Sequence, residues 1–501
     1  MSLQFITGGS GAGKSEYLSR LVCEESVRRP HDNFIVVVPE QYTMETQKKL
    51  VHMHSRKGIL NIDVVSFERL AYKVFEELGG GNRPVLDDTG KNLIVRRVLE
   101  KEKKKLDYFG SSIEKTGFVS ELKSVISELL QYGITPQQLG EIGENVKEKQ
   151  QLSAKLKDIR LVYEEFMAFL STNYITSEEI LDVLCGLVEK SKLIAGSEII
   201  FDGFTGFTPI QYKLMRLLLV YSKGIKISVT IDKKERPTGH EGWNNLFFMS
   251  KEMMNRLIAI CEEEGINVDD TVCVDRDINY RYEGAKDLAY LERNLFRYKG
   301  GVYTGTPENI RIYEGSNPKE ELQYIVSEIL QLTRKEGFRY RDIAVVTADL
   351  ETYGKVAANM MKQNDIPAFL DYKRSVAANP YVEMLCSALE IVEKGYPYDT
   401  MFRYLRTGLT GISRHDIDML ENYCLAVGIR GSRAWHEPWK KKMKRSTYQP
   451  ELETLNALRE QIMAPLLNLE AVLKDKEANV RAYVTAVYEF VTALHLSLIH
   501  I

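Results

Sequence analysis

Eight consecutive residues near the start of the chain form a pattern that binds phosphate. They are Gly8, Gly9, Ser10, Gly11, Ala12, Gly13, Lys14 and Ser15. Glycines let several backbone N–H groups converge on one anion, and the N-terminus of the following helix adds partial positive charge. In this pattern the lysine reaches the β- and γ-phosphates, and the serine hydroxyl binds Mg²⁺. The residues therefore predict an ATP–Mg²⁺ site, although they do not say whether ATP is hydrolysed.

An acidic residue at the end of a later strand is needed to complete the magnesium site of a phosphate loop. Asp202 ends the apolar run 198–202, and Asp232 ends the run 226–232. Nucleotide-driven motors usually place a glutamate directly after the first aspartate, where it activates water. Here that position is Gly203, which cannot accept a proton. The sequence predicts a site that binds ATP and is poorly equipped to hydrolyse it.

The elements that position these residues follow from the apolar pattern. The runs 34–38 and 62–67 follow the first strand and helix, which predicts a parallel βαβ sheet. Long helical periodicity then replaces the strand pattern, and the sheet resumes near residue 198. We expect a first nucleotide-binding domain at 1–86 and 191–300, interrupted by a helical insertion at 87–190.

A second alternation of strands and helices begins after a turn-rich stretch near residue 300. Strands are expected at 310–313, 343–347 and 366–370, and helices at 318–333 and 353–363. We assign 301–380 to the first part of a second α/β domain. The remaining stretch, 381–501, is expected to be a helical insertion that is cut short, because it stops within an apolar helical pattern.

Composition narrows the class of protein. The chain has 501 residues, a formal net charge of −3 and 44% hydrophobic residues, values ordinary for a globular protein of several domains. The charge argues against a uniformly basic nucleic-acid surface but leaves local basic faces open. Six cysteines occur without any C-x-x-C, and no apolar run approaches 18 residues. These features predict reduced thiols, a cytoplasmic location and no membrane span.

Two other classes of function remain open on the phosphate loop alone. A small-molecule kinase would also use such a loop, although a long helical insertion and a second α/β domain disfavour it. A non-catalytic scaffold could bind nucleotide only to stabilise its own fold. A kinase should turn over ATP with a small acceptor, and a DNA-binding subunit should bind single strands with a steep salt dependence. A scaffold should do neither.

Further segments give the chain a specific resemblance. These are the phosphate loop, Val-Pro-Glu-Gln at 38–41, 65–71, 201–211, 371–375 with Asn379-Pro380, and 422–431 with Trp435. In order and spacing the chain resembles the N-terminal part of AddB, one of the two subunits of the bacterial AddAB helicase–nucleases. The resemblance implies an α/β fold of the P-loop NTPase class, with RecA-like, helicase-like domains, parallel sheets and large helical insertions.

The resemblance also implies a function. AddB pairs with AddA in an ATP-dependent helicase and exonuclease that processes double-strand DNA ends for repair by homologous recombination. AddA carries the motor, whereas AddB helps recognise the Chi sequence in single-stranded DNA and contributes a nuclease. The AddB nuclease and its 4Fe-4S cluster belong to a C-terminal half that this chain lacks. We therefore expect no catalytic residue in this fragment.

Site residues follow from the same resemblance. Gly8 to Ser15 would bind ATP, and Ser15 with Asp202 would bind Mg²⁺. Residues on loops that face single-stranded DNA in related motors are Gln41, Ser66, Phe67 and Arg69. Phe67 could instead belong to the core, and Arg69 could be a surface charge. Lys373 and Arg374 would contact either a γ-phosphate or the DNA backbone, or remain solvated.

Overall fold

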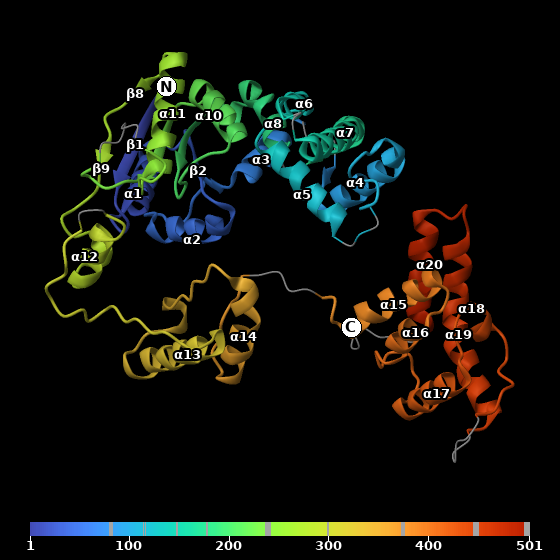
Figure 1. Ribbon diagram of the computed structural model, residues 1–501. Helices are drawn as coiled ribbons and strands as arrows, with labels where there is room; N and C mark the ends of the chain where they lie inside the picture. The colour runs from blue at the N-terminus through green and yellow to red at the C-terminus, as the bar shows by residue number, and fades with distance from the viewer. Residues whose placement is uncertain are drawn as a thin grey trace. The chain divides into compact units, whose positions relative to one another are not determined.

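The computed structural model of the chain (Figure 1) forms two compact units, Met1–Ile312 and Tyr313–Ile501. Each unit is described by itself. The residues that the structure describes are 1–79, 84–113, 115, 117–146, 149–176, 179–235, 242–297, 300–371, 376–443 and 450–494. Within these ranges no helix combines the length and the apolar character needed to cross a membrane.

The first unit is built on one parallel sheet, as the sequence predicted. Its strands are β1 (Ser2–Gly8), β2 (Asn33–Val37), β3 (Ile62–Val65), β6 (Ser197–Phe201), β7 (Gly224–Thr230), β8 (Asn267–Val268) and β9 (Val272–Cys273). The order across the sheet is β3-β2-β6-β7-β1-β8, and β9 also pairs with β1. Every strand pairing in the described part of the sheet is parallel. All carboxyl ends therefore lie at one edge, where α/β sheets bind ligands.

Both faces of the sheet are covered by helices because its strands are apolar on both sides. Phe5 and Ile35 belong to one core, whereas the next residues along each strand, Ile6 and Val36, belong to another. The helices of the first core are α3 (Phe67–Leu78), α8 (Ile180–Cys185), α10 (Pro209–Tyr221) and α11 (Phe248–Glu264). Those of the second core are α1 (Lys14–Arg28) and α2 (Thr43–Met53). The result is a three-layer α/β/α arrangement.

A group of helices with its own core separates β3 from β6 in sequence. It contains β4 (Val85–Leu86), α4 (Asp88–Glu102), α5 (Phe118–Gln131), α6 (Pro136–Asn145), α7 (Gln150–Asn173) and β5 (Ile175–Thr176). The core is centred on Val95, Val162 and Phe166, which are almost fully buried. The remaining short elements of the unit are η1 (Glu40–Tyr42), η2 (Lys103–Lys105), η3 (Val188–Lys190), α9 (Lys192–Ala195), η4 (Tyr280–Tyr282) and α12 (Lys286–Asn294).

The described part of the second unit is helical and has two separate cores. One lies between α13 (Pro318–Lys335) and α14 (Leu350–Gln363), which flank the short η5 (Tyr340–Asp342). The other is formed by α15 (Pro380–Lys394), α16 (Tyr398–Leu405), α17 (Arg414–Val427), α18 (Ser432–His436), α19 (Leu452–Lys474) and α20 (Val480–Ala493).

The three strands expected at 310–313, 343–347 and 366–370 are not present, so this prediction was wrong. The structure places these residues outside any hydrogen-bonded ladder. A strand needs a neighbour for its N–H and C=O groups, and the described residues of the second unit supply helices only. Apolar side chains that a sheet would bury, such as Val346 and Phe369, are each 91% exposed.

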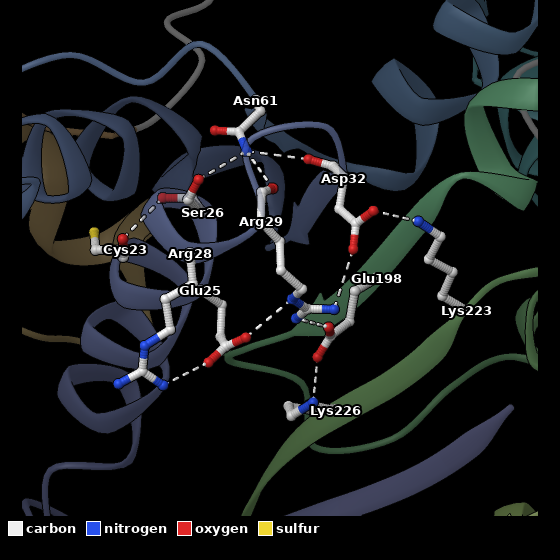
Figure 2. Close-up of polar contacts among 10 residues, drawn as sticks. All are labelled: Cys23, Glu25, Ser26, Arg28, Arg29, Asp32, Asn61, Glu198, Lys223 and Lys226. Atoms are coloured by element: carbon white, nitrogen blue, oxygen red, sulfur yellow. Dashed lines mark hydrogen bonds and ion pairs between the residues drawn. The ribbon is translucent and has the colours of Figure 1, made fainter.

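An ion cluster joins α1 to the amino end of the sheet (Figure 2). The guanidinium of Arg29, the residue that follows α1, donates to Glu198 of β6 at 2.5 Å. Lys226 of β7 donates to the other oxygen of the same carboxylate. Burial alone would raise the pKa of Glu198, but the hydrogen bonds from Lys226 and Arg29 outweigh it and hold the pKa below its usual range. The cluster therefore contains a carboxylate that stays charged.

A second carboxylate extends the cluster toward the surface. Asp32 accepts from Arg29 at 3.3 Å and from Lys223 at 2.5 Å. The side-chain amide of Asn61 donates to the carbonyls of Ser26, Arg29 and Asp32, and so closes the turn after α1 (Figure 2). These bonds fix where α1 ends relative to β2.

We expect Glu198→Gln to destabilise the first unit by about 2 kcal/mol at pH 7, because it leaves Arg29 and Lys226 without their shared partner and Arg29 is partly solvated. Since the folded-state pKa of Glu198 is lowered, the stabilisation is complete above its ordinary value of 4.5 and is lost as the pH falls through the lower folded value. Amide hydrogen exchange of β2, β6 and β7 at several pH values measures both effects. Glu252→Gln, which removes an exposed i,i+4 partner of Arg256, is the matched control and should change little. Equal exchange in the two variants would contradict the prediction.

Candidate nucleotide site

The glycine-rich loop turns directly from β1 into α1 at the carboxyl edge of the sheet. Gly8 is the last residue of β1, and Lys14 is the first of α1. Gly11 and Gly13 have φ values of 73° and 93°, which side-chain-bearing residues rarely adopt. The glycines therefore allow the backbone to fold around the N-terminus of α1, as binding a phosphate requires.

Lys14 lies across the loop. Its Nζ donates to the carbonyls of Gly8 and Gly9 at 2.9 Å each. Burial lowers the pKa of the Lys14 ammonium, and this effect exceeds the opposing attraction of Asp202 and Asp275. A partly desolvated ammonium held by two backbone carbonyls can exchange them for phosphate oxygens, which are stronger acceptors.

Asp202 lies at the end of β6, and its position is fixed by a neighbouring strand. Ser228 of β7 donates to the Asp202 carboxylate at 2.5 Å, and the Gly203 N–H donates to the same serine hydroxyl at 3.3 Å. The Ser15 side chain is exposed in the first turn of α1. No group of three or more His, Cys, Asp or Glu residues suited to a metal ion occurs among the residues described. A Mg²⁺ ion here would depend on phosphate oxygens and water as well as on Ser15 and Asp202.

A distant segment packs onto the loop, and the sequence analysis missed it. Asn279, which is 4% exposed, donates to the Ser10 carbonyl at 3.4 Å. The Arg281 N–H donates to the Gly11 carbonyl at 3.3 Å, and the Arg281 guanidinium donates to the Ser10 hydroxyl at 3.2 Å. A Cβ on Gly11 would lie only 2.5 Å from the Cβ of Arg281. The loop therefore carries a second cation besides Lys14.

Tyr280 places an aromatic ring beside the start of α1. A Cβ on Gly13 would lie 3.4 Å from the Tyr280 ring, and the Arg276 guanidinium lies 4.2 Å from the ring centroid. The tyrosine is 59% exposed. An exposed ring next to a phosphate loop can stack on a nucleotide base. The adjacent Tyr280-Arg281 pair was the only sequence signal, and nothing in its spacing links it to residues 8–15.

Acidic side chains also approach the loop at Gly9. A Cβ on Gly9 would lie 3.1 Å from Oε1 of Glu292 in α12 and 3.4 Å from Oδ1 of Asp275. Burial raises the pKa of Glu292, and the nearby Asp275 and Asp232 raise it further. Asp232 itself is paired with Arg297 at 3.1 Å. The site thus combines the two cations that contact the loop, Lys14 and Arg281, with four nearby carboxylates, those of Asp202, Asp232, Asp275 and Glu292.

Comparison with known proteins identifies the family. A family model described as "ADDB, N-terminal" matches residues 5–292, more than half of the chain. The chain belongs to the AddB family. It is 41% identical to a protein of Lachnoclostridium phytofermentans and 33% identical to one of Clostridium novyi, each named as the B subunit of an ATP-dependent helicase/deoxyribonuclease. Both alignments cover 99% of this chain but only 43% of the relative, so the chain spans less than half the length of these proteins.

The resemblance to AddB is therefore confirmed, and the residues that it led us to expect near DNA can be placed on the fold. Gln41 is exposed just after β2. The Arg69 guanidinium pairs with Glu40 at 3.1 Å, and both side chains are more than half exposed. Lys373 and Arg374 lie outside the described residues. Gln41 in η1 and Arg69 in the first turn of α3 thus lie in neighbouring segments at the carboxyl edge of β2 and β3.

The other two residues that the resemblance led us to expect near DNA, Ser66 and Phe67, have local structural partners. The Ser66 hydroxyl accepts from the Arg69 N–H at 3.3 Å and caps α3, and Ser66 is 6% exposed. Phe67 is 8% exposed, and its ring contacts Phe201, Phe204 and Phe207 with centroid distances of 5.4 to 6.0 Å. In this conformation Phe67 belongs to the core and supports the loop after β6.

The sheet order separates the segments that carry Gln41 and Arg69 from the phosphate loop of the AddB chain. Passing from β1 to β2 crosses β7 and β6, which is three inter-strand steps or about 14 Å. Asp202, at the end of β6, lies between the two regions. A ligand on one region could therefore influence the other through the loop that carries Asp202.

We expect Gly11→Ala to release the Arg281 segment from the phosphate loop, because the new methyl group collides with Arg281 and forces an unfavourable φ. Amide exchange of residues 276–283 should rise at least tenfold. Gly58→Ala is the control, since a Cβ on Gly58 would make only an ordinary contact at 3.9 Å and the residue has no restricted φ. Unchanged protection of 276–283 in Gly11→Ala would show that the loop and the segment are not coupled.

Proposed function

We propose that the chain is the nucleotide- and DNA-binding part of the AddB component of an ATP-dependent helicase and exonuclease. The observation that carries this proposal is the pairing of a complete phosphate loop with the Arg281 segment, at the ligand-binding edge of a parallel sheet. The relatives are named as one subunit of a larger enzyme, which supports a heterodimer, and we propose an AddA-type partner. The complex would process double-strand DNA ends in the cytoplasm for recombinational repair.

The nucleotide would bind with its phosphates against Gly8 to Ser15. Lys14 would leave the carbonyls of Gly8 and Gly9 for the β- and γ-phosphates. Arg281 reaches Ser10 and would bind a phosphate from the other side, and Tyr280 would stack on the base. Mg²⁺ would bind Ser15 and Asp202, directly or through water, and would neutralise phosphate charge when bound.

The fold supports assignment to the P-loop NTPase class with RecA-like domains. The strand that carries the loop lies between parallel neighbours, and β6 delivers an aspartate at the same edge. We assign 1–86 and 191–300 to the first such domain, with 87–190 inserted. Residues 301–380 would begin the second, and 381–501 would form another insertion. The nuclease and the 4Fe-4S cluster would belong to the part of the relatives that this chain does not span.

ATP binding tests the proposal. Lys14→Ala should weaken ATP binding at least 30-fold, a loss of about 2 kcal/mol, because a charge-assisted hydrogen bond to phosphate disappears. Arg20→Ala, which removes an exposed cation from the same helix, should bind normally. Titration calorimetry measures both affinities, and ATP turnover should be negligible with or without single-stranded DNA.

Brisk DNA-stimulated hydrolysis that Lys14→Ala abolishes would contradict a non-motor subunit. Phosphate transfer to a small acceptor would favour a kinase instead. ATP binding without any DNA binding would favour a scaffold.

DNA binding provides the second test. Arg69→Ala should weaken binding of single-stranded oligonucleotides regardless of sequence and reduce the salt slope by about one, because one phosphate contact is lost. Arg216→Ala removes a surface cation from α10, where it pairs with Glu263 and Glu264, and should not change binding. Fluorescence anisotropy distinguishes the variants. Measured between about 50 and 200 mM salt, it gives the slope of log affinity against log salt concentration. Equal losses of affinity in Arg69→Ala and Arg216→Ala would indicate that DNA is attracted to surface charge in general and makes no contact at Arg69.

A further inference from the structure

The two charged groups nearest to the Gly9 peptide have opposite signs. The Lys14 ammonium lies 2.9 Å from the Gly9 carbonyl oxygen. The Glu292 carboxylate from α12 approaches Gly9 from another side, with Oε1 3.1 Å from the position of a Cβ. The backbone N–H of Ser10 faces this carboxylate and partly offsets the rise in its pKa. Glu292 thus lies beside one of the loop's own anion-binding groups.

The terminal phosphate of a nucleotide is expected at the same end of the loop. Lys14 reaches the β- and γ-phosphates in a phosphate loop. Arg281 holds its guanidinium 3.2 Å from the Ser10 hydroxyl. A γ-phosphate bound by both cations would lie against Ser10, beside the N–H that Glu292 faces. The phosphate and the carboxylate, both negatively charged, would then repel each other.

We propose that Glu292 is a specificity residue that favours nucleoside diphosphates over triphosphates at this site. The proposal rests on the nucleotide site proposed above and adds a selection among its ligands. The β-phosphate lies deeper in the loop, near the N-terminus of α1, where no acidic side chain packs against Gly11 or Gly13 in the described structure. The γ-phosphate alone would meet the carboxylate. Triphosphate binding would require Glu292 to move or to take up a proton.

The charges around Glu292 favour this role. Asp275 and Asp232 face it from the loops after β9 and β7, and one Asp275 oxygen is buried without a hydrogen-bond partner. Cations at the same hollow are Lys233, Lys234 and Arg293, in addition to Lys14. Burial, followed by the two aspartates, raises the pKa of Glu292. An approaching phosphate raises it further, so triphosphate binding should take up a proton and strengthen as the pH falls through this pKa.

The test compares Mg-ADP and Mg-ATP by titration calorimetry on the full chain between pH 6 and pH 8. Glu292→Gln keeps the shape of the side chain and removes its charge. It should tighten Mg-ATP about tenfold at pH 8, leave Mg-ADP within twofold, and remove the pH dependence of the ratio between them. Glu263→Gln, an exposed glutamate on α11, should leave both affinities unchanged.

Other results separate the possible failures. An unchanged ratio in Glu292→Gln, or an equal change for both nucleotides, would overturn the selection while leaving the nucleotide site intact. A wild-type chain that binds neither nucleotide would contradict the proposed function itself. If Glu292→Gln does not fold, the wild type still tests the proposal. Titrations in buffers of different ionisation enthalpy measure the protons that it takes up on binding each nucleotide. Uptake with ATP but not with ADP supports the proposal, and equal uptake overturns it.

Discussion

The parallel pairing of β1 with its neighbours is the constraint on which the candidate site depends. Two of these neighbours, β7 and β9, end by hydrogen bonding to the β1–loop junction: the Ile231 N–H donates to the Gly8 carbonyl, and the Val274 N–H donates to the Thr7 carbonyl. These backbone bonds deliver the residues after β7 and β9 to the two sides of the phosphate loop. Because parallel strands share one carboxyl edge, backbone pairing alone brings segments more than 200 residues apart in sequence together there.

Helix α1 connects that edge to the opposite one. Its 15 residues span about 22 Å, from Lys14 at the loop to the Arg29 cluster at the amino ends of β6 and β7. The loop needs a helix whose N-terminus does not shift when an anion arrives or leaves. A helix held at its far end by a buried carboxylate meets that need, since moving it would separate Arg29 from Glu198. The ion cluster lies at the opposite end of α1 from the phosphate loop, yet it fixes the direction of this helix.

The parts of this arrangement that sequence can predict are the local ones. Eight adjacent residues define the phosphate loop, and short apolar runs define β1, β2, β3, β6 and β7 to within one or two residues. Asp202 could be assigned because it ends one of those runs. Phe67 could not be assigned between surface and core, because that depends on Phe201, Phe204 and Phe207 arriving from another strand. Arg281 and Glu292 were missed because a two-residue strand, β9, controls their approach and leaves almost no pattern. The segments at 343–347 and 366–370 failed for the opposite reason. Their apolar pattern is strong, but a strand forms only when a neighbouring strand accepts and donates its backbone hydrogen bonds. The described residues of the second unit offer no such neighbour.

The absence of a glutamate after Asp202 is supported by the backbone as well as by the side chain. Gly203 has a φ of 85°, and a Cβ there would lie 3.4 Å from the ring of Pro39. A glutamate at this position would adopt an unfavourable conformation and would disturb the N–H that Gly203 donates to Ser228. Restoring a motor would therefore require a different path for the loop after β6, which also carries Phe204 and Phe207. If the proposed nucleotide binds here without being hydrolysed, it would contribute to stability by mass action, about 2.7 kcal/mol at a hundredfold excess over its Kd. That energy would act on the contact between the phosphate loop and the Arg281 segment, so nucleotide would hold together two parts of the chain that only a few hydrogen bonds now join.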